Sequence, residues 1–310
     1  MQNSEHHKLI ILGAGPAGLT AGLYAARADL EPVVFTGLLP YGQASLTHII
    51  ENYPGFPKGI GGTELGQLIE EQAVKFGAVI VYDQVISLDL SVRPFVINTY
   101  GKSLTADAVI LAMGADSKKL NVPGETELTG RGVSYCGTCD GWFFKNKEIH
   151  VVGGGDSALE ESLLLTHFAK SVTIIHRRDA LRAGVILEKR AKDHPKIHFL
   201  WDTVVREILG EEGVTGLLVE NVKTGQQTEI GSDGVFVFIG HQPNTGILAG
   251  QIDLDEKGYV RVDNLMQTNL PGVFAAGEIA DPQYRQVITS AGMGAAAAIQ
   301  AVHYLEAFES

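Results

Sequence analysis

The sequence predicts an α/β protein with two similar strand–turn–helix–strand units. Two glycine-rich turns, far apart along the chain, each follow an apolar strand and precede a helix. A chain of 310 residues is too long for one ordinary core, which favours two domains. Hydrophobic residues make up 45% of the chain and charged residues 19%, which is typical of a globular protein with a sizeable core.

The first unit reads KLIILGAGPAGLTAGLYAARADLEPVVF. We expect a strand at 9–12, the turn Gly13-x-Gly15-x-x-Gly18, a helix at 17–28 and a second strand at 32–35. The three glycines permit a tight turn, close approach of a pyrophosphate to the backbone, and close packing of helix on strand. A dinucleotide's phosphates would then lie at a helix N-terminus. The flanking strand and helix favour this interpretation over a glycine-rich turn in an unrelated α/β protein.

The second unit reads EIHVVGGGDSALEESLLLTHFAKSVTIIHRRDALR. A strand beginning at 149 leads into Gly153-x-Gly155-x-x-Ala158, a helix follows, and the next strand ends in the basic run 176–178. An acid at that place would accept from a ribose 2′-hydroxyl, whereas arginines accommodate a 2′-phosphate. The pattern favours NADP(H) over NAD; the alternative is a solvated basic turn with Arg182 capping the next helix.

The first unit has neither an acid nor a cation at the corresponding place, where its second strand ends in Phe35-Thr36-Gly37. Its site is suited to a tightly bound flavin nucleotide. Two further stretches support a flavin: TADAVILAMGA at 105–115, and TNLPGVFAAGEIAD at 268–281, which contains Glu278. A helix within 284–305 is rich in small residues, and an N-terminus near Ala291 would stabilise negative charge on a reduced flavin. An Ala/Gly-rich core helix is the alternative.

The only two cysteines, Cys136 and Cys139, lie in SYCGTCDGWFF. A zinc site needs four ligands, and the chain has no third cysteine; His176 belongs to the basic run and His150 is mid-strand, so we predict no metal. A structural disulfide is uncommon in the cytosol, and a buried inert pair has no positive support. Cys-x-x-Cys spacing lets the two sulfurs meet, and helix-terminal thiols form thiolates readily. A redox pair, with Asp140 able to supply a proton, is therefore favoured.

Charge and hydropathy exclude several classes of partner. Lys and Arg number 24 against 36 Asp and Glu, giving a net charge of −12, which argues against nucleic acid as the main partner. The start, MQNSEHHKLIILGAG, lacks the apolar region of a signal peptide. No apolar run approaches the ~20 residues that a membrane span needs. We therefore expect a cytoplasmic protein with no membrane contact.

The motifs together resemble the low-molecular-weight thioredoxin reductases over nearly the whole chain. They are, in order, GAGPAGLTAGLYAARA, ENYPGF, CGTCDG, GGGDSALEE, HRRDALRA, VFIGHQPNT, FAAGE and YRQVITSAGMG. The resemblance implies a homodimer that carries FAD, uses NADPH and reduces the disulfide of thioredoxin, which would be a separate protein. It also implies two Rossmann-like domains: a discontinuous FAD domain, 1–117 and 246–310, and an inserted NADPH domain with the redox pair, 118–245.

The resemblance extends to individual positions. Cys139 would face the flavin as a thiolate, Cys136 would attack the thioredoxin disulfide, and Asp140 would be the acid/base. The expected FAD-binding residues are Gly13, Gly15, Pro16, Ala17, Thr36, Gln43, Asn52, Val85, Gly277, Glu278, Arg285, Gln286 and Val287. The expected NADPH-binding residues are Gly155, Asp156, Ser157, Ala158, His176, Arg177, Arg178 and Arg182. The NADPH domain would rotate about the segments GADSKKLNVPGE and GHQPNTG between the two half-reactions.

Three departures from the family pattern bear on the flavin. Glu278 stands where the family usually has Asp, the turn 112–114 reads Ala-Met-Gly, and LLPYGQAS replaces the usual Gly-Gly-Gln-Leu. We expect FAD to stay bound with an altered affinity or potential. One rival function is a related flavoenzyme linked to ferredoxin or oxygen, which the second glycine turn and the arginines disfavour. The other is a non-catalytic nucleotide sensor, which the Cys-x-x-Cys-Asp run disfavours.

Overall fold

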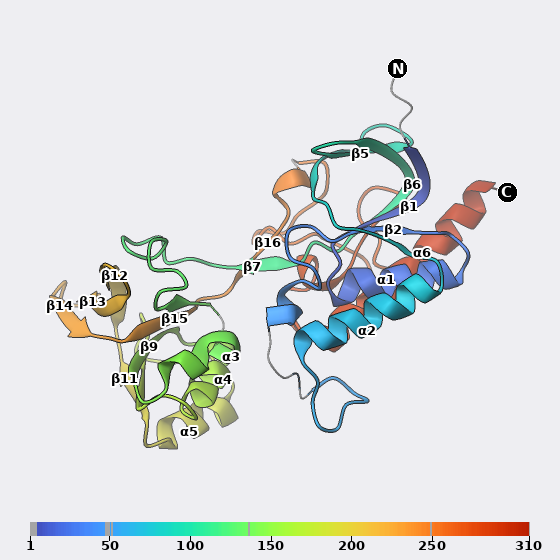
Figure 1. The fold of residues 1–310 in the computed structure, drawn as a ribbon. Helices are drawn as coiled ribbons and strands as arrows, with labels where there is room; N and C mark the ends of the chain where they lie inside the picture. The colour runs from blue at the N-terminus through green and yellow to red at the C-terminus, as the bar shows by residue number, and fades with distance from the viewer. Residues whose placement is uncertain (1–4, 47–49, 51, 136, 249, 310) are drawn as a thin grey trace. The chain divides into compact units, whose positions relative to one another are not determined.

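The computed structural model describes residues 5–46, 50, 52–135, 137–248 and 250–309. The chain forms two compact units, shown in Figure 1: Met1–Asp116 with Gln242–Ser310, and the inserted Ser117–His241. Each unit has its own mainly parallel sheet and its own helices. The predicted α/β class is confirmed.

The first unit is built on a seven-stranded sheet. Its order is β3 (Val79–Val81), β2 (Val33–Phe35), β1 (Glu5–Leu12), β6 (Ser103–Leu111), β5 (Phe95–Thr99) and β4 (Val85–Asp89), and β17 (Val273–Ala275) also pairs with β6. Five strands run parallel to one another: β1, β2, β3, β6 and β17. Strand β5 is antiparallel to both of its neighbours, β4 and β6. Residues 9–12 of β1 are at most 1% exposed, because both faces of a parallel sheet are covered.

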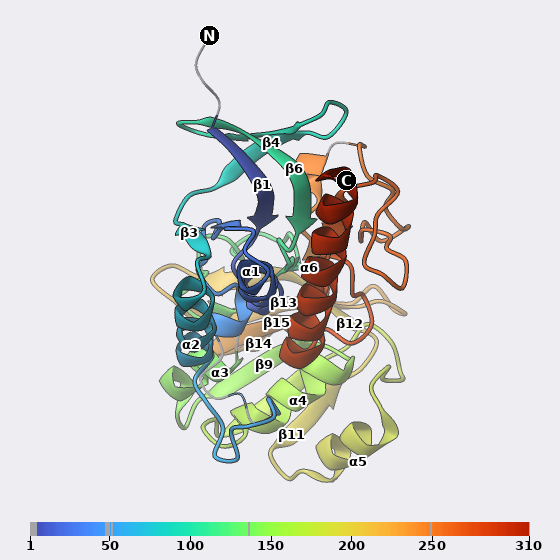
Figure 2. The ribbon, with the colours of Figure 1, turned by 90° about the vertical axis from the view of Figure 1, so that its right-hand side faces the viewer.

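Three helices, α1 (Pro16–Arg27), α2 (Gly62–Lys75) and α6 (Val287–Glu309), belong to this unit. Figure 2 shows α1 between α2 and α6, and both of these helices contact it. The 3₁₀ turns η1 (Gln43–Leu46), η3 (Gly246–Leu248) and η4 (Gly277–Ile279) lie in the connections. Helix α6 begins at Val287, so the expectation of an N-terminus near Ala291 is wrong by a full turn.

The second unit has a five-stranded parallel sheet. Its order is β11 (Ile197–Leu200), β10 (Ser171–Ile175), β9 (Glu148–Gly153), β15 (Gly234–Phe238) and β8 (Val133–Ser134). Its helical segments are α3 (Gly137–Asp140), η2 (Gly141–Phe144), α4 (Asp156–Leu165) and α5 (Val185–Asp193). A separate antiparallel sheet contains β12 (Thr203–Gly210), β13 (Val214–Asn221) and β14 (Gln227–Gly231).

Two short strands, β7 (Ala115–Ser117) and β16 (His241–Pro243), pair where the chain passes between the units. The Lys118 N–H donates to Gly240 O at 2.8 Å, and the Asn244 N–H donates to Gly114 O at 3.0 Å. None of the helices in the described ranges is long and apolar enough to cross a membrane.

Candidate cofactor sites

The glycine turn of the first unit is tightly packed. Gly13 has φ +102°, and a Cβ built on it would lie 2.2 Å from Ala112 O. A Cβ on Gly18 would lie 1.7 Å from Gly13 O, so any side chain at either position would clash with backbone. Gly15 is the N-cap of α1 and Pro16 its first residue, which is where proline costs no hydrogen bond. The turn therefore presents the free N–H groups of a helix N-terminus at the end of β1.

Residues expected to bind the flavin converge on this end of the sheet from distant parts of the chain. Asn52 Nδ2 donates to Gln286 Oε1 at 3.0 Å, which joins the second half of the chain to the first. Gly277 has φ +77°, and a Cβ there would lie 2.7 Å from the Ala17 Cβ. Thr36, just after β2, is 5% exposed.

Two further expected flavin residues lie at the edges of this region. Gln43 Nε2 donates to Asp116 Oδ1 at 3.2 Å, so η1 is held against the segment that leaves β6. Val85 begins β4 and is buried. The chain just before it is joined to the end of β2, because the Gly37 N–H donates to Asp83 O at 3.1 Å.

Sequence reasoning missed Asp281, which shapes the loop before α6. Asp281 is 5% exposed, and its carboxylate accepts from the N–H groups of Gln283 at 2.9 Å, Tyr284 at 2.8 Å and Arg285 at 2.8 Å. Arg285 has φ +50°, a left-handed conformation that this loop holds in place. The available signal was an aspartate that opens a short loop before a helix, where such side chains bond their own backbone.

Glu278 is a half-buried carboxyl group in η4. Burial raises its pKa to about 7; the charge of Arg285 opposes this shift, while Asp281 and Asp116 add to it. The site favours either a protonated carboxyl or a ligand that donates hydrogen bonds to the carboxylate. A polyhydroxylated chain such as a flavin's ribityl group fits that requirement.

The glycine turn of the second unit combines close packing with one open position. A Cβ on Gly153 would lie 2.5 Å from Phe238 O, and one on Gly154 would lie 2.3 Å from the His176 ring. Gly155 is the N-cap of α4, and a Cβ there would meet no atom of the described residues within 4 Å. The backbone at Gly155 is thus open to a phosphate, while the two glycines before it pack against the rest of the fold. Buried Ala158, 0% exposed, allows α4 to pack closely on β9.

The loop between β10 and α5, residues 176–184, is called the basic loop. Hydrogen bonds join it to this turn. The Arg182 N–H donates to Gly154 O at 2.7 Å, and the Gly184 N–H donates to Asp156 Oδ1 at 2.7 Å. His176 is 5% exposed, with Nε2 3.0 Å from Ala180 O. Burial lowers the pKa of His176, and its ring packs against Gly154 of the turn.

The three arginines of the basic loop are exposed at the ribose end of the second turn. Within the part of the chain that the structure describes, Arg177, Arg178 and Arg182 have no carboxylate within 4.0 Å. Guanidinium groups in such a loop could hold an anion, and their fork geometry suits a phosphate.

The redox segment is described only in part. Cys136 lies outside the described residues, and Cys139 belongs to α3 although its side chain also lies outside them. Asp140 is half-buried at the end of α3. A Cβ on Gly137 would lie 2.3 Å from Glu161 Oε2, and one on Gly141 would lie 3.0 Å from Leu165 Cδ2, so α3 and η2 pack directly on α4.

Two nucleotide-binding turns and a Cys-x-x-Cys segment define the class of a nucleotide-dependent disulphide oxidoreductase. Residues 7–294 match the family described as pyridine nucleotide-disulphide oxidoreductase. The chain belongs to this family.

Known proteins with similar sequences match this chain over nearly their full length. The chain is 48% identical to a thioredoxin reductase of Streptomyces coelicolor, over 98% of this chain and 95% of that one. It is 43% identical to one of Coxiella burnetii, over 99% and 98%. The crystal structure of Lactococcus lactis thioredoxin reductase is similar with a TM-score of 0.89 and 40% identity, over 97% and 99%. The predicted resemblance to thioredoxin reductases is confirmed, and the protein is an enzyme that uses a pyridine nucleotide.

Proposed function

We propose that this enzyme transfers electrons from NADPH, through FAD and a Cys136–Cys139 pair, to the disulfide of a separate thioredoxin. The observation that carries the NADPH assignment is that Arg177, Arg178 and Arg182 are exposed with no carboxylate within 4.0 Å among the described residues, in a loop that is hydrogen-bonded to the glycine turn through the Arg182 N–H. A 2′-phosphate dianion is the group that distinguishes NADPH and that such a cluster recognises.

FAD fits the first unit because its turn opens on a helix N-terminus and no cation follows β2. In this proposal Gly15, Pro16 and Ala17 contact the pyrophosphate, Glu278 accepts from the ribityl chain, and Asn52 with Gln286 lies at the isoalloxazine end. When bound, FAD accepts a hydride from NADPH and returns two electrons to a disulfide. The residues of this chain position it and exclude water from it.

The dithiol step uses the only two cysteines in the chain. Reduced Cys136 attacks one sulfur of the thioredoxin disulfide, and the other sulfur leaves as a thiolate that takes a proton from Asp140. Cys139 then attacks the mixed disulfide, which releases reduced thioredoxin and restores the Cys136–Cys139 disulfide. One NADPH and one proton are consumed for each thioredoxin disulfide reduced.

A domain rotation, a homodimer and a cytoplasmic location belong to the same proposal. The short segments around β7 and β16, which include Gly114 and Gly240, would act as hinges between the two half-reactions. Light scattering of the purified holoenzyme would give the oligomeric state directly.

The decisive experiment is an anaerobic titration with NADPH that follows flavin absorbance, followed by addition of oxidised thioredoxin. We expect bleaching by NADPH and recovery with thioredoxin. Bleaching without recovery would show an NADPH flavoenzyme with another disulfide partner. No bleaching would contradict the NADPH assignment and favour a ferredoxin- or oxygen-linked enzyme.

A further inference from the structure

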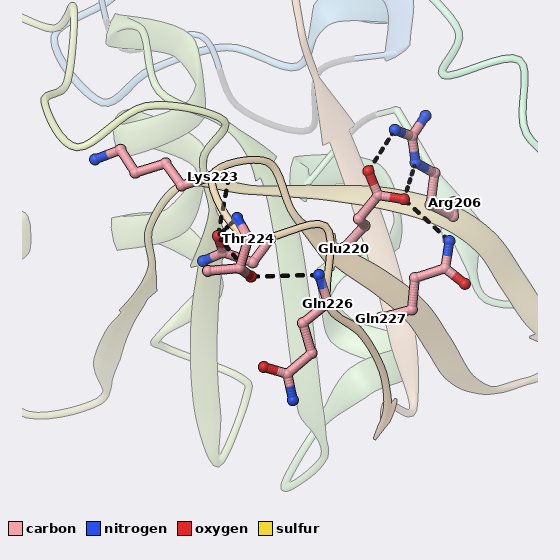
Figure 3. Close-up of polar contacts among 7 residues, drawn as sticks. Arg206, Glu220, Lys223, Thr224, Gln226 and Gln227 are labelled. Atoms are coloured by element: carbon pink, nitrogen blue, oxygen red, sulfur yellow. Dashed lines mark hydrogen bonds and ion pairs between the residues drawn. The ribbon is translucent and has the colours of Figure 1, made fainter.

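The hairpin turn between β13 and β14, residues 222–226, is held by hydrogen bonds and contains a lysine, Lys223. Asn221 Oδ1 accepts from the N–H groups of Lys223 at 3.0 Å and Thr224 at 3.1 Å, and the Gly225 N–H donates to Asn221 O at 2.8 Å. Figure 3 shows Lys223, Thr224 and Gln226 at this turn, where Thr224 Oγ1 accepts from the Gln226 N–H at 3.3 Å. The conformation of Lys223's backbone is therefore set by its own turn.

Side-chain hydrogen bonds also join the strands that lead into and out of the turn. Glu220 accepts from Arg206 Nε at 3.0 Å and from a second Arg206 nitrogen at 2.7 Å, and Gln227 Nε2 donates to the same carboxylate at 3.0 Å (Figure 3). These bonds join β12, β13 and β14 side by side. The turn projects from a stable three-stranded sheet.

This turn lies against the basic loop of the nucleotide site. The Val222 N–H donates to Asp202 O at 2.7 Å, and the Asp202 N–H donates to Arg178 O at 3.3 Å. Two backbone bonds thus connect the lysine turn, through the chain at 202, to the second arginine of the run.

Lys223 is paired with two acids at this place. Its Nζ lies 2.9 Å from Asp202 Oδ2 and 3.1 Å from Asp179 Oδ2. Asp179 directly follows Arg177 and Arg178 in the sequence. The hydrogen bond to Asp202 is the largest cause of a raised pKa of Lys223, and the bond from Lys223 lowers the pKa of Asp179.

The stability of the fold does not explain the Lys223–Asp179 pair. The side chains of Lys223 and Asp179 are 59% and 74% exposed, and exposed ion pairs contribute little to folding. The pair bears on binding, because Asp179 is a carboxylate in the same short loop as the guanidinium groups of Arg177 and Arg178. Asp179 pairs with Lys223, whereas the arginines have no carboxylate within 4.0 Å among the described residues.

We propose that Lys223 is a specificity-determining residue for the 2′-phosphate, which acts by neutralising Asp179 and Asp202 beside the arginine cluster. This inference rests on the proposed use of NADPH. Without Lys223, Asp179 would compete with the phosphate for the arginines, and both carboxylates would repel a dianion. The affinity for NADH, which carries no 2′-phosphate, would not change.

The test is the Lys223→Gln holoenzyme, assayed with NADPH and with NADH as donors to oxidised thioredoxin. We expect the KM for NADPH to rise about three- to tenfold, from one unit of charge lost near the surface, with a smaller effect at high salt. The KM for NADH and both kcat values should stay unchanged. The inhibition constant of adenosine 2′,5′-bisphosphate should rise in parallel with the KM for NADPH.

A charge-restoring variant and a matched control sharpen the test. One lysine and two aspartates sum to −1 in the wild type, to −2 in Lys223→Gln, and again to −1 in Lys223→Gln/Asp179→Asn. The double variant should regain most of the wild-type KM for NADPH. Lys170→Gln is the control, because Lys170 pairs with Glu148 at 2.7 Å. This pair lies beside the amino ends of β9 and β10, whereas the basic loop follows the carboxyl end of β10.

Two results would overturn the inference: equal changes in the KM for both donors, or no recovery in the double variant. The Arg177→Ala/Arg178→Ala enzyme separates this failure from that of the proposed function. If the arginine variant loses its preference for NADPH and Lys223→Gln does not, only the role of Lys223 is wrong. If the arginine variant keeps its preference, the nucleotide assignment fails and the role of Lys223 fails with it.

Discussion

Glu278 is a residue whose environment changes its protonation state near neutral pH. An exposed glutamate is ionised at neutral pH, whereas this one is held half-buried in η4, with Asp281 and Asp116 nearby. Its pKa of about 7 means that the apoprotein carries this carboxyl partly protonated at neutral pH. A ligand that donates hydrogen bonds to Glu278 would return it to the ionised form.

This shift predicts how the stability of the apoprotein depends on pH. The folded pKa lies above the ordinary value of 4.5, so the folded state binds the proton more tightly than the unfolded chain. This contribution to the free energy of unfolding is fully present below about pH 4.5 and is lost as the pH rises through about 7. A shift of this size corresponds to about 3 kcal/mol. Thermal unfolding of apoprotein across this range should show the loss, and Glu278→Gln should reduce it. An identical pH profile in the variant would contradict the assignment.

At the scale of elements, the contact between α1 and α6 supports the first glycine turn. A Cβ on Gly294 of α6 would lie 2.1 Å from Ala17 O, which is backbone and cannot swing aside. The two helices therefore approach as closely as glycine allows, and α1 is held where its N-terminus meets the turn.

We predict that Gly294→Ala lowers stability by about 1–3 kcal/mol through overpacking and weakens retention of FAD. Gly292 is the matched control in the same helix, since a Cβ there would meet no described atom within 4 Å. Gly292→Ala should be neutral or stabilising by about 0.5–1 kcal/mol. Thermal unfolding and the flavin-to-protein absorbance ratio would measure both effects; equal values for the two variants would refute the packing argument.

The basic loop after β10 gives a second prediction at this scale. In Arg177→Ala/Arg178→Ala the KM for NADPH should rise roughly tenfold or more, because two charge-assisted hydrogen bonds to the 2′-phosphate are lost. The KM for NADH should change little. Parallel steady-state kinetics with the two donors would show the difference, and equal effects would argue against a 2′-phosphate at this loop.

At the scale of the whole molecule, the proposed activity divides into two half-reactions with separate residues. Hydride transfer needs both nucleotide sites, whereas reduction of thioredoxin needs the cysteine pair. The inserted unit, Ser117–His241, carries both the basic loop and the redox segment, so both half-reactions of the proposed activity depend on residues of this unit.

We therefore predict that Cys136→Ser separates the two half-reactions. The variant should retain bound flavin and its bleaching by NADPH, and should lose thioredoxin reduction by at least about 10³-fold, because the attacking thiolate is gone. Anaerobic absorbance followed by addition of oxidised thioredoxin would measure both. Thr138→Ser, between the two cysteines, is the control and should remain active. Wild-type turnover in Cys136→Ser would remove the dithiol mechanism.

The sequence by itself determined the features that depend on local backbone geometry. Both glycine turns, the strands before them and the helices after them are readable from it, because a strand, a tight turn and a helix start constrain residues that are close in the chain. The α/β class and the family followed from these motifs and their order. The roles of the predicted site residues remain predictions, since no ligand tests them.

Only the tertiary structure decided which remote residues meet. The Asn52–Gln286 bond and the pairing of Lys223 with Asp179 and Asp202 join segments that no local pattern connects. Helix α6 begins at Val287, where the loop held by Asp281 ends, and its composition alone placed the start too late. Long-range contacts depend on how whole sheets and hairpins pack, so local spacing cannot reveal them.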